Sequence, residues 1–331
     1  DLRNFYMLPG LVDSHGHMTH LGKNQYEVDL RDCKSEYEVV NKIKNFLDLN
    51  NNLLWINGGG WNQENFDTKL LPDNKYLSIN FPNIPVTLSR IDGHAIWCNK
   101  KALDMANIHE DTPVPDGGEI LKKDGLLTGI LVDKAQQLIR NIIPSESIED
   151  VKKWILKAQE VCLSNGLTEV HDAGISSIQF DAYKELINEG KLKIRVYAMA
   201  NQELFENNIS KYKSELFELR SVKLVADGAL GSNGAALIDQ YQNLDTYGIL
   251  ILDKNKLKTL FSQAFKEDFQ VCIHAIGDKT NREIVRALRE VLGNSDQDQF
   301  DHRTRIEHAQ IIKASDIKEI YDLNIIASVQ P

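Results

Sequence analysis

The sequence has few cysteines, no long apolar run and no excess of positive charge, and each absence excludes a class of protein. Its four cysteines are spread over 331 residues without a Cys-x-x-Cys pair, which argues against a zinc knuckle, a thioredoxin-type motif or a disulfide scaffold. No apolar stretch approaches the ~18 residues that suggest a membrane span. The 48 Asp and Glu residues outnumber the 38 Lys and Arg, giving a net charge of −10, so we expect neither nucleic acid nor an anionic membrane as a partner.

Cysteines that are few and widely spaced favour a reducing compartment, such as the cytoplasm. The chain begins at Asp1, with neither a methionine nor a signal-like segment. We therefore expect a piece of a longer protein, whose true N-terminus and targeting information lie outside this sequence.

Short apolar runs alternate with amphipathic helical stretches along most of the chain, and 42% of its residues are hydrophobic. This alternation is typical of an α/β fold whose βα units form a parallel sheet or barrel. Seven strands are expected in series, at residues 7–13, 167–171, 193–198, 221–226, 271–275, 305–308 and 325–329. A closed (β/α)8 barrel needs one more strand, so we expect a TIM-like barrel without its eighth strand.

The stretch from residue 55 to residue 140 interrupts this series. It is rich in Gly, Pro and Asp, with the segments GGGWNQ, FPNIPVTLSRIDGH and DTPVPDGGEILKKDG. We expect an inserted β-rich subdomain between strands one and two. Residues 1–54 would then hold the first strand and first helix of the barrel, and residues 141–331 would hold strands two to seven.

Histidines end several of the expected strands. His15 and His17 are two residues apart, so their side chains point to the same face of strand one, although a single His-x-His pair also occurs by chance. His274 and His308 end strands five and six, where either one alone could be a packed core or rim residue. Because the carboxyl ends of barrel strands meet on one face, the recurrence favours a metal site there.

Lys223 lies within the expected fourth strand, Ser-Val-Lys-Leu-Val-Ala. An ammonium inside a barrel is costly, so one alternative places Lys223 on the outer face with its head in water. The other places a lysine of lowered pKa inside the barrel, where reaction with CO₂ gives a carbamate whose two oxygens can bridge two metal ions. Spacing along the sequence does not choose between them.

Eight segments resemble the amidohydrolase superfamily, and within it the subfamily of N-substituted formamide deformylase and the YtcJ-like hydrolases, amidohydrolase family 3. They extend from residue 8 to residue 310 and read LPGLVDSHGH, GGGWNQENFD, LSRIDGHAIWCNKKAL, GGEILKKDGLLTGIL, GLTEVHDAG, VKLVADGALGSNGAAL, VCIHAIGD and RIEHAQ. The small β-sandwich that family members build from both chain ends is missing from this sequence. The resemblance therefore implies a chain that is truncated at both ends.

The resemblance implies a binuclear metal site on the barrel. One metal would bind His15, His17, a carbamate on Lys223 and an Asp of strand eight, which would lie beyond residue 331. The other metal would bind the same carbamate together with His274 and His308. Zinc is the expected metal, with manganese, iron and cobalt as alternatives.

Four further residues are candidates for catalysis or substrate binding. The resemblance places a substrate-contacting histidine at His94, which is otherwise a turn residue after Gly93. Trp61 either lines the substrate pocket or packs in a core. His171, at the end of strand two, either polarises a carbonyl or supports a metal ligand. Asp227, after strand four, is expected to orient a ligand or the substrate.

The expected function is hydrolysis of a C–N bond, in an amide or an N-substituted formamide, by a metal-activated hydroxide. The expected substrate is a small-molecule amide, and a homodimer is compatible with the sequence. Donors such as His94 or His171 would stabilise the oxyanion. Two alternatives stay open: a hydrolase of esters, lactones or cyclic amides, and a non-catalytic metal-binding fragment that lacks the strand-eight Asp.

Overall fold

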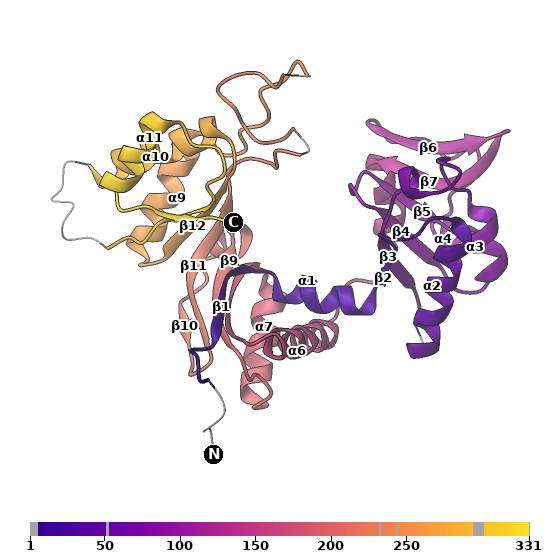
Figure 1. Ribbon diagram of the computed structural model, residues 1–331, viewed down its shortest axis with the longest axis horizontal. Helices are drawn as coiled ribbons and strands as arrows, with labels where there is room; N and C mark the ends of the chain where they lie inside the picture. Colours follow the sequence, from indigo (N-terminus) through magenta and orange to yellow (C-terminus); the bar gives the residue numbers. More distant parts are fainter. Residues whose placement is uncertain (1–5, 51–52, 232, 243, 294–300, 331) are drawn as a thin grey trace. The chain divides into compact units, whose positions relative to one another are not determined.

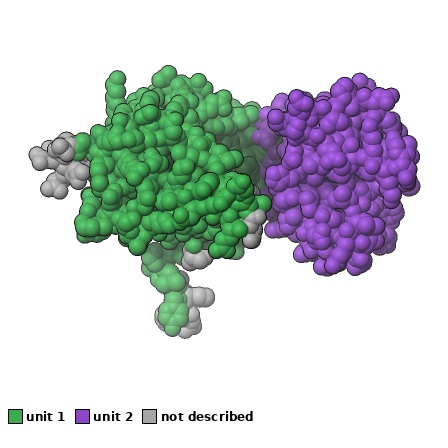
Figure 2. Space-filling view, turned by 90° about the horizontal axis from the view of Figure 1, so that it is seen from above, with its two compact units in different colours: residues 1–20, 148–331 green, residues 21–147 purple. Residues whose placement is uncertain are grey.

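The computed structural model describes residues 6–50, 53–231, 233–242, 244–293 and 301–330. The chain divides into two compact units, coloured green and purple in Figure 2: the first consists of residues 1–20 and 148–331, and the second of residues 21–147. Each unit has its own sheet. None of the helices in the described ranges is long and apolar enough to cross a membrane.

The first unit contains a parallel sheet of seven strands, which confirms the expected βα series. Its strand order is β1-β8-β9-β11-β12-β13-β14, and every neighbouring pair is parallel. The strands are β1 Leu11–Gly16, β8 Leu167–Ile175, β9 Arg195–Asn201, β11 Phe217–Val225, β12 Gln270–Ala275, β13 Arg305–His308 and β14 Ile326–Ser328. A short strand, β10 (Tyr212–Lys213), pairs antiparallel with the start of β11.

This sheet curls into a near-closed barrel, because side chains of strands that are not neighbours meet inside it. Arg305, on β13, donates a hydrogen bond of 2.7 Å to the backbone oxygen of Ser14, on β1. Nζ of Lys223, on β11, lies 3.4 Å from Nε2 of His15, also on β1. A parallel sheet that curls in this way brings the carboxyl ends of its strands to one face.

Helices follow the strands of the first unit and bury apolar side chains, as connections between parallel strands require. They are α6 Ile148–Ser164, α7 Ser177–Asn188, α8 Gln202–Glu206, α9 Lys254–Lys266, α10 Asp278–Leu292 and α11 Ala314–Asp322, while α1 Met18–Lys23 contains the boundary between the units at residue 20. In α10 the side chains of Ile284, Val285 and Leu288 are buried. α9 and α10 lie side by side, as do α6 and α7 (Figure 1).

The second unit has a mixed six-stranded sheet with the order β2-β3-β4-β5-β7-β6. Its strands are β2 Val28–Asp29, β3 Ile56–Trp61, β4 Val86–Arg90, β5 Ala95–Cys98, β6 Gly118–Lys123 and β7 Leu126–Asp133. Its α-helices are α2 Glu36–Leu49, α3 Asn74–Asn80, α4 Lys100–Met105 and α5 Gln137–Arg140, and its 3-10 helices are η1 Asn24–Tyr26, η2 Gln63–Asn65 and η3 Lys134–Gln136.

This unit begins earlier in the chain than the subdomain expected at residues 55–140. Val39 and Ile43 of α2 are buried in the same apolar core as Ile56 and Leu88 of the second sheet. The helix that the sequence placed in the barrel therefore belongs to the second unit, because its apolar face is covered there. The structure thus divides the chain at residues 20 and 147.

Asp172, in β8, ties its strand to the start of α1 and to α7. Its buried carboxylate accepts a hydrogen bond of 3.0 Å from the backbone N–H of Met18 and one of 2.7 Å from the hydroxyl of Tyr183. Burial raises the pKa of Asp172 to about 6, and the two donors oppose that rise. One buried carboxylate thus holds the chain directly after His17 in place.

Replacing Tyr183 tests this contact. Tyr183→Phe removes one donor and leaves a buried carboxylate oxygen unsatisfied, so we expect the free energy of unfolding to fall by about 1–3 kcal/mol. Chemical denaturation followed by circular dichroism measures the difference. Tyr321→Phe, at a residue that is 80% exposed on α11, is the control and should change stability by less than ~0.5 kcal/mol. Equal stability of Tyr183→Phe and the wild type would contradict the role of this contact.

Candidate metal centre

The site begins at the carboxyl end of β1, where His15 and His17 flank Gly16. The two imidazole rings make an edge contact with their centroids 5.4 Å apart. A Cβ atom on Gly16 would lie 2.7 Å from Cγ1 of Val170, on β8. The glycine between the histidines therefore lets β1 pack closely against its neighbouring strand while both imidazoles stand at the strand end.

Lys223, on β11, places its side-chain nitrogen next to the ring of His15. The residue is only 8% exposed, and its Nζ lies 3.4 Å from Nε2 of His15. Burial lowers the pKa of Lys223 to about 8, and the nearby carboxylate of Glu307 opposes that effect. The sequence left two positions open for the Lys223 side chain, and in the structure it lies inside the barrel.

His274 and His308 extend the cluster from β12 and β13. The ring of His308 approaches those of His15 and His274, with centroid distances of 4.9 and 4.6 Å. The backbone of His308 and of the following Ala309 has φ angles of 76° and 41°, a region that residues other than glycine rarely adopt. Such strain persists only where the surrounding structure holds it, and it is concentrated at functional sites.

The donor atoms of this cluster have the chemistry of a metal site. Zinc binds histidine nitrogens at about 2.0–2.1 Å, which places the centroids of two rings on one ion about 5 Å apart. Burial lowers the pKa of His274 and of His308, which favours the neutral imidazole that binds metal. Over the described ranges, no group of three or more His, Cys, Asp or Glu side chains is arranged to hold an ion as it stands. Binding would therefore require the side chains to adjust.

Two charged residues of β13, Arg305 and Glu307, belong to the site although the sequence did not suggest them. Glu307 is fully buried, and its Oε2 accepts a hydrogen bond of 2.6 Å from Nδ1 of His15. Nε of Arg305 lies 2.8 Å from Oε1 of Glu307. Strand alternation places residues 305 and 307 on one face of the strand, but it does not tell whether that face lies inside the barrel.

Asp227, after β11, holds the loops around His274. Its fully buried carboxylate accepts hydrogen bonds of 3.1, 3.0 and 2.8 Å from three backbone N–H groups, those of Ala236, Ile276 and Gly277. Nε2 of His274 lies 3.4 Å from Oδ1 of Asp227 and 3.4 Å from the backbone oxygen of Gly228. These acceptors favour a proton on Nε2, which leaves Nδ1 of His274 as the atom that can bind a metal.

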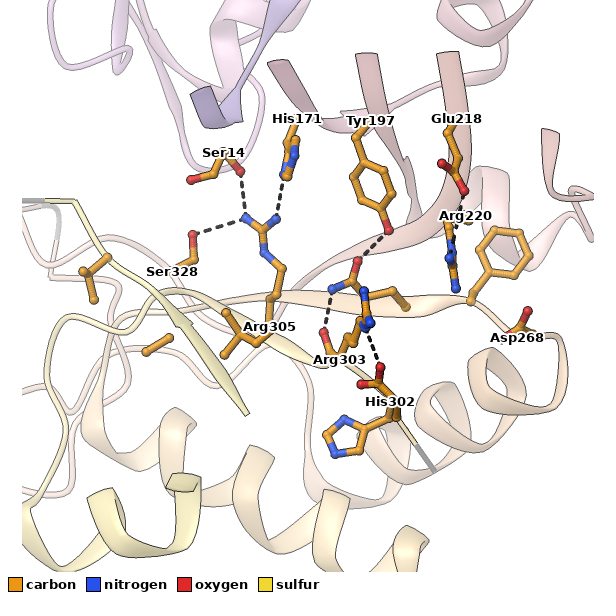
Figure 3. Close-up of a pocket in the computed structure, with 16 residues that line it drawn as sticks. Ser14, His171, Tyr197, Glu218, Arg220, Asp268, His302, Arg303, Arg305 and Ser328 are labelled. Atoms are coloured by element: carbon orange, nitrogen blue, oxygen red, sulfur yellow. Dashed lines mark hydrogen bonds and ion pairs between the residues drawn. The ribbon is translucent and has the colours of Figure 1, made fainter. Parts of the chain in front are cut away.

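His171, expected at the end of its strand, lies in the middle of β8 and lines a cavity of roughly 600 Å³, most of whose lining residues lie near the amino ends of the barrel strands. Gln270 and Arg305, which also line this cavity, are the first residues of β12 and β13. Figure 3 shows the ring of His171 beside Arg305, with Nδ1 2.9 Å from the guanidinium. Burial lowers the pKa of His171, and the charge of Arg305 adds to the effect. Because barrel enzymes react at the carboxyl ends, this cavity is not the expected place of chemistry.

A second cavity, of roughly 370 Å³, lies at the carboxyl ends of β8, β9 and β11. His17 and Lys223 line it together with Gln179 and Asn201. Apart from Lys223 and the buried Asp172, its lining contains no carboxylate and no ammonium group. This recess therefore suits an uncharged part of a small molecule, next to the candidate metal ligands.

Two other expected site residues, His94 and Trp61, belong to the second unit. Nδ1 of His94 lies 2.7 Å from Oδ1 of Asp133, and this hydrogen bond raises the pKa of the exposed His94. Trp61 is fully buried, donates 2.8 Å to the backbone oxygen of Leu88 and makes an edge contact with Trp97. Its burial fits packing in a core, one of the two alternatives, whereas substrate contact by His94 stays a prediction.

The model of the amidohydrolase family matches residues 1–331. The protein YtcJ of Bacillus subtilis (strain 168) is 32% identical over 342 residues, which cover 100% of this chain and 63% of that protein. The N-substituted formamide deformylase of Arthrobacter pascens is 25% identical over 351 residues, which cover 98% of this chain and 62% of that enzyme.

A solved structure shows the same fold at similar identity. An uncharacterized metal-dependent hydrolase from Pyrococcus horikoshii OT3 superimposes with a TM-score of 0.80 and 28% identity, over 98% of this chain and 62% of that one. The chain thus spans less than two thirds of the length of these relatives. Because the family model matches the whole chain, this protein belongs to the amidohydrolase family, in the subfamily of YtcJ and the N-substituted formamide deformylase.

Proposed function

We propose that the protein is a metal-dependent hydrolase that cleaves the C–N bond of an amide or an N-substituted formamide. The observation that carries the proposal is the meeting of histidines from β1, β12 and β13 with Lys223 at the carboxyl ends of the barrel strands. Family membership supports a hydrolase. The formamide is the substrate named for the Arthrobacter pascens enzyme, and it applies to this chain only as part of the proposal.

The proposed site holds two divalent ions, with zinc as the first choice. His15 and His17 would bind one ion, and His274 and His308 the other. Lys223 would serve both: its neutral amine bonds to CO₂ and releases one proton, and the two oxygens of the resulting carbamate reach both ions. The lowered pKa of Lys223 supports this role, because it increases the fraction of neutral amine near pH 7.

Divalent ions in such a site supply hydroxide near pH ~7 and polarise a carbonyl oxygen. Which substrate binds at this site depends on the side chains that surround it. The recess beside His17 and Lys223 would hold the uncharged part of a neutral amide without leaving an unpaired charge in it. The expected role of His94 as a donor to the oxyanion stays part of the proposal. Trp61, whose side chain is fully buried, and His171, which lies in the other cavity beside Arg305, have no role in it.

Loss of one proposed ligand tests the metal site. We expect the natural full-length protein to bind divalent metal and hydrolyse amides. His274→Ala should weaken metal binding by more than about 100-fold, because losing a direct ligand exceeds the 10–100-fold effect of losing an outer partner. Metal analysis and a panel of amides, esters and lactones measure both properties.

The control for this experiment is His109→Ala, at an exposed histidine of the second unit, which should leave metal content and hydrolysis unchanged. The proposal would be wrong if the wild-type protein bound no metal, or if His274→Ala hydrolysed amides as fast as the wild type does. A clear preference for esters or lactones would instead assign the site to another bond class.

Lys223→Ala tests the carbamate. We expect a loss of activity of about 100-fold or more, partly restored by a short carboxylic acid such as propionate, whose two oxygens can replace those of the carbamate. Lys318→Ala, at a lysine whose side chain is 80% exposed, is the control and should retain full activity. In wild-type protein supplied with ¹³CO₂, carbon NMR should show a carbamate signal that Lys223→Ala lacks. Absence of that signal from the active wild type would contradict the proposed bridge.

A further inference from the structure

Glu307 joins β13 to β1 through the ring of His15. Its Oε2 accepts a hydrogen bond of 2.6 Å from Nδ1 of His15, and the Glu307 side chain is 0% exposed. Its other oxygen, Oε1, lies 2.8 Å from Nε of Arg305. Water does not reach this carboxylate, so the groups that it contacts are all groups of the protein.

This hydrogen bond determines which nitrogen of His15 carries a proton. The guanidinium of Arg305 contacts both carboxylate oxygens: its Nε lies 2.8 Å from Oε1, and its Nη2 donates a hydrogen bond of 3.1 Å to Oε2. A carboxylate paired with a guanidinium in this way carries the negative charge and can only accept hydrogen bonds. Nδ1 of His15 must then be the donor, and Nε2 keeps a lone pair on the side of Lys223 Nζ, 3.4 Å away.

Arg305 is itself held from three other strands. Its guanidinium donates 2.7 Å to the backbone oxygen of Ser14 and 3.2 Å to the hydroxyl of Ser328, and it lies 2.9 Å from Nδ1 of His171 (Figure 3). These partners belong to β1, β14 and β8. Arg305 thus offsets the charge of Glu307 and fixes the carboxylate relative to β1.

Stability alone gives little reason to bury this pair. Removing two charges from water is costly, and apolar replacements of buried ion pairs are often neutral or stabilising. Metal binding does give a reason. An imidazole that donates to a carboxylate is fixed in orientation and becomes a more basic ligand through its other nitrogen.

We propose that Glu307 is a positioning residue of the metal site and that Arg305 anchors it. Glu307 holds the ring of His15 so that Nε2, rather than Nδ1, is presented to the metal beside Lys223. The inference rests on the proposed function, since it requires a metal at His15. It adds two residues of β13 that act through a ligand and do not themselves bind the ion.

Zn²⁺ affinity of the natural full-length protein, measured by titration against a chelator, tests this role. Glu307→Gln keeps an oxygen that can accept from His15 but loses the charge, so we expect Zn²⁺ to bind 10–100-fold more weakly. Glu307→Ala loses both and should bind more weakly still. Asp316→Asn is the matched control, because Asp316 pairs with Arg282 elsewhere in the first unit, and its Zn²⁺ affinity should equal that of the wild type.

The outcomes separate the possible failures. If Glu307→Gln lowers the unfolding temperature of the metal-free protein but binds Zn²⁺ as tightly as the wild type does, Glu307 is only structural and the inference is overturned. If the wild type binds no Zn²⁺, the proposed function itself fails.

The wild-type protein gives a second test that does not depend on how the variants fold. Long-range ¹H–¹⁵N spectra of histidine-labelled, metal-free protein report which ring nitrogen carries the proton. We expect His15 to be protonated on Nδ1 and to stay so when Zn²⁺ is added. A proton on Nε2 of His15 in the metal-free protein would overturn the positioning role.

Discussion

The contact between His15 and Glu307 can exist only if the sheet curls, because β1 and β13 are not neighbours in it. Once the sheet is curled, the carboxyl ends of its strands share one face. Histidines that lie hundreds of residues apart in the sequence then approach within ring contact, as His15 and His308 do. The candidate metal centre is therefore a consequence of strand order and curvature, more than of any local motif.

Three charged side chains, Lys223, Arg305 and Glu307, lie inside this barrel, and the negative charge of Glu307 makes the burial of the two positive ones less costly. Glu307 opposes the fall in the pKa of Lys223 that burial causes, while the charge of Arg305 adds to that fall. Arg305 and His15 together keep Glu307 ionised. An isolated charge in this position would strongly destabilise the folded protein. Burial of these charges is possible because opposite charges lie next to one another. Nζ of Lys223, 3.4 Å from Nε2 of His15, is the nitrogen that the proposed chemistry modifies.

Much of this arrangement could be predicted from residue spacing. Histidines at strand ends indicated the face of the barrel, and the apolar runs gave all seven parallel strands of the first unit. The roles of Arg305 and Glu307 could not be recognised in the same way, since a short strand with alternating charges also reads as a solvent-exposed edge. Only the curled sheet shows that both side chains face β1.

The boundary of the second unit also could not be predicted from the sequence. An amphipathic helix such as α2 shows that it must bury one face, but not which sheet covers that face. Its burial beside Leu88 assigns it to the second sheet. For Trp61, spacing likewise left pocket and core open, and the full burial of its side chain fits the core.

Anomalous diffraction at the zinc absorption edge, from crystals of the natural full-length protein grown with Zn²⁺, locates the bound metal directly. We expect two peaks at the carboxyl ends of the barrel strands, one beside His15 and His17 and one beside His274 and His308, with Lys223 between them. Peaks confined to other parts of the protein, or none at all in the presence of Zn²⁺, would contradict the proposed metal site.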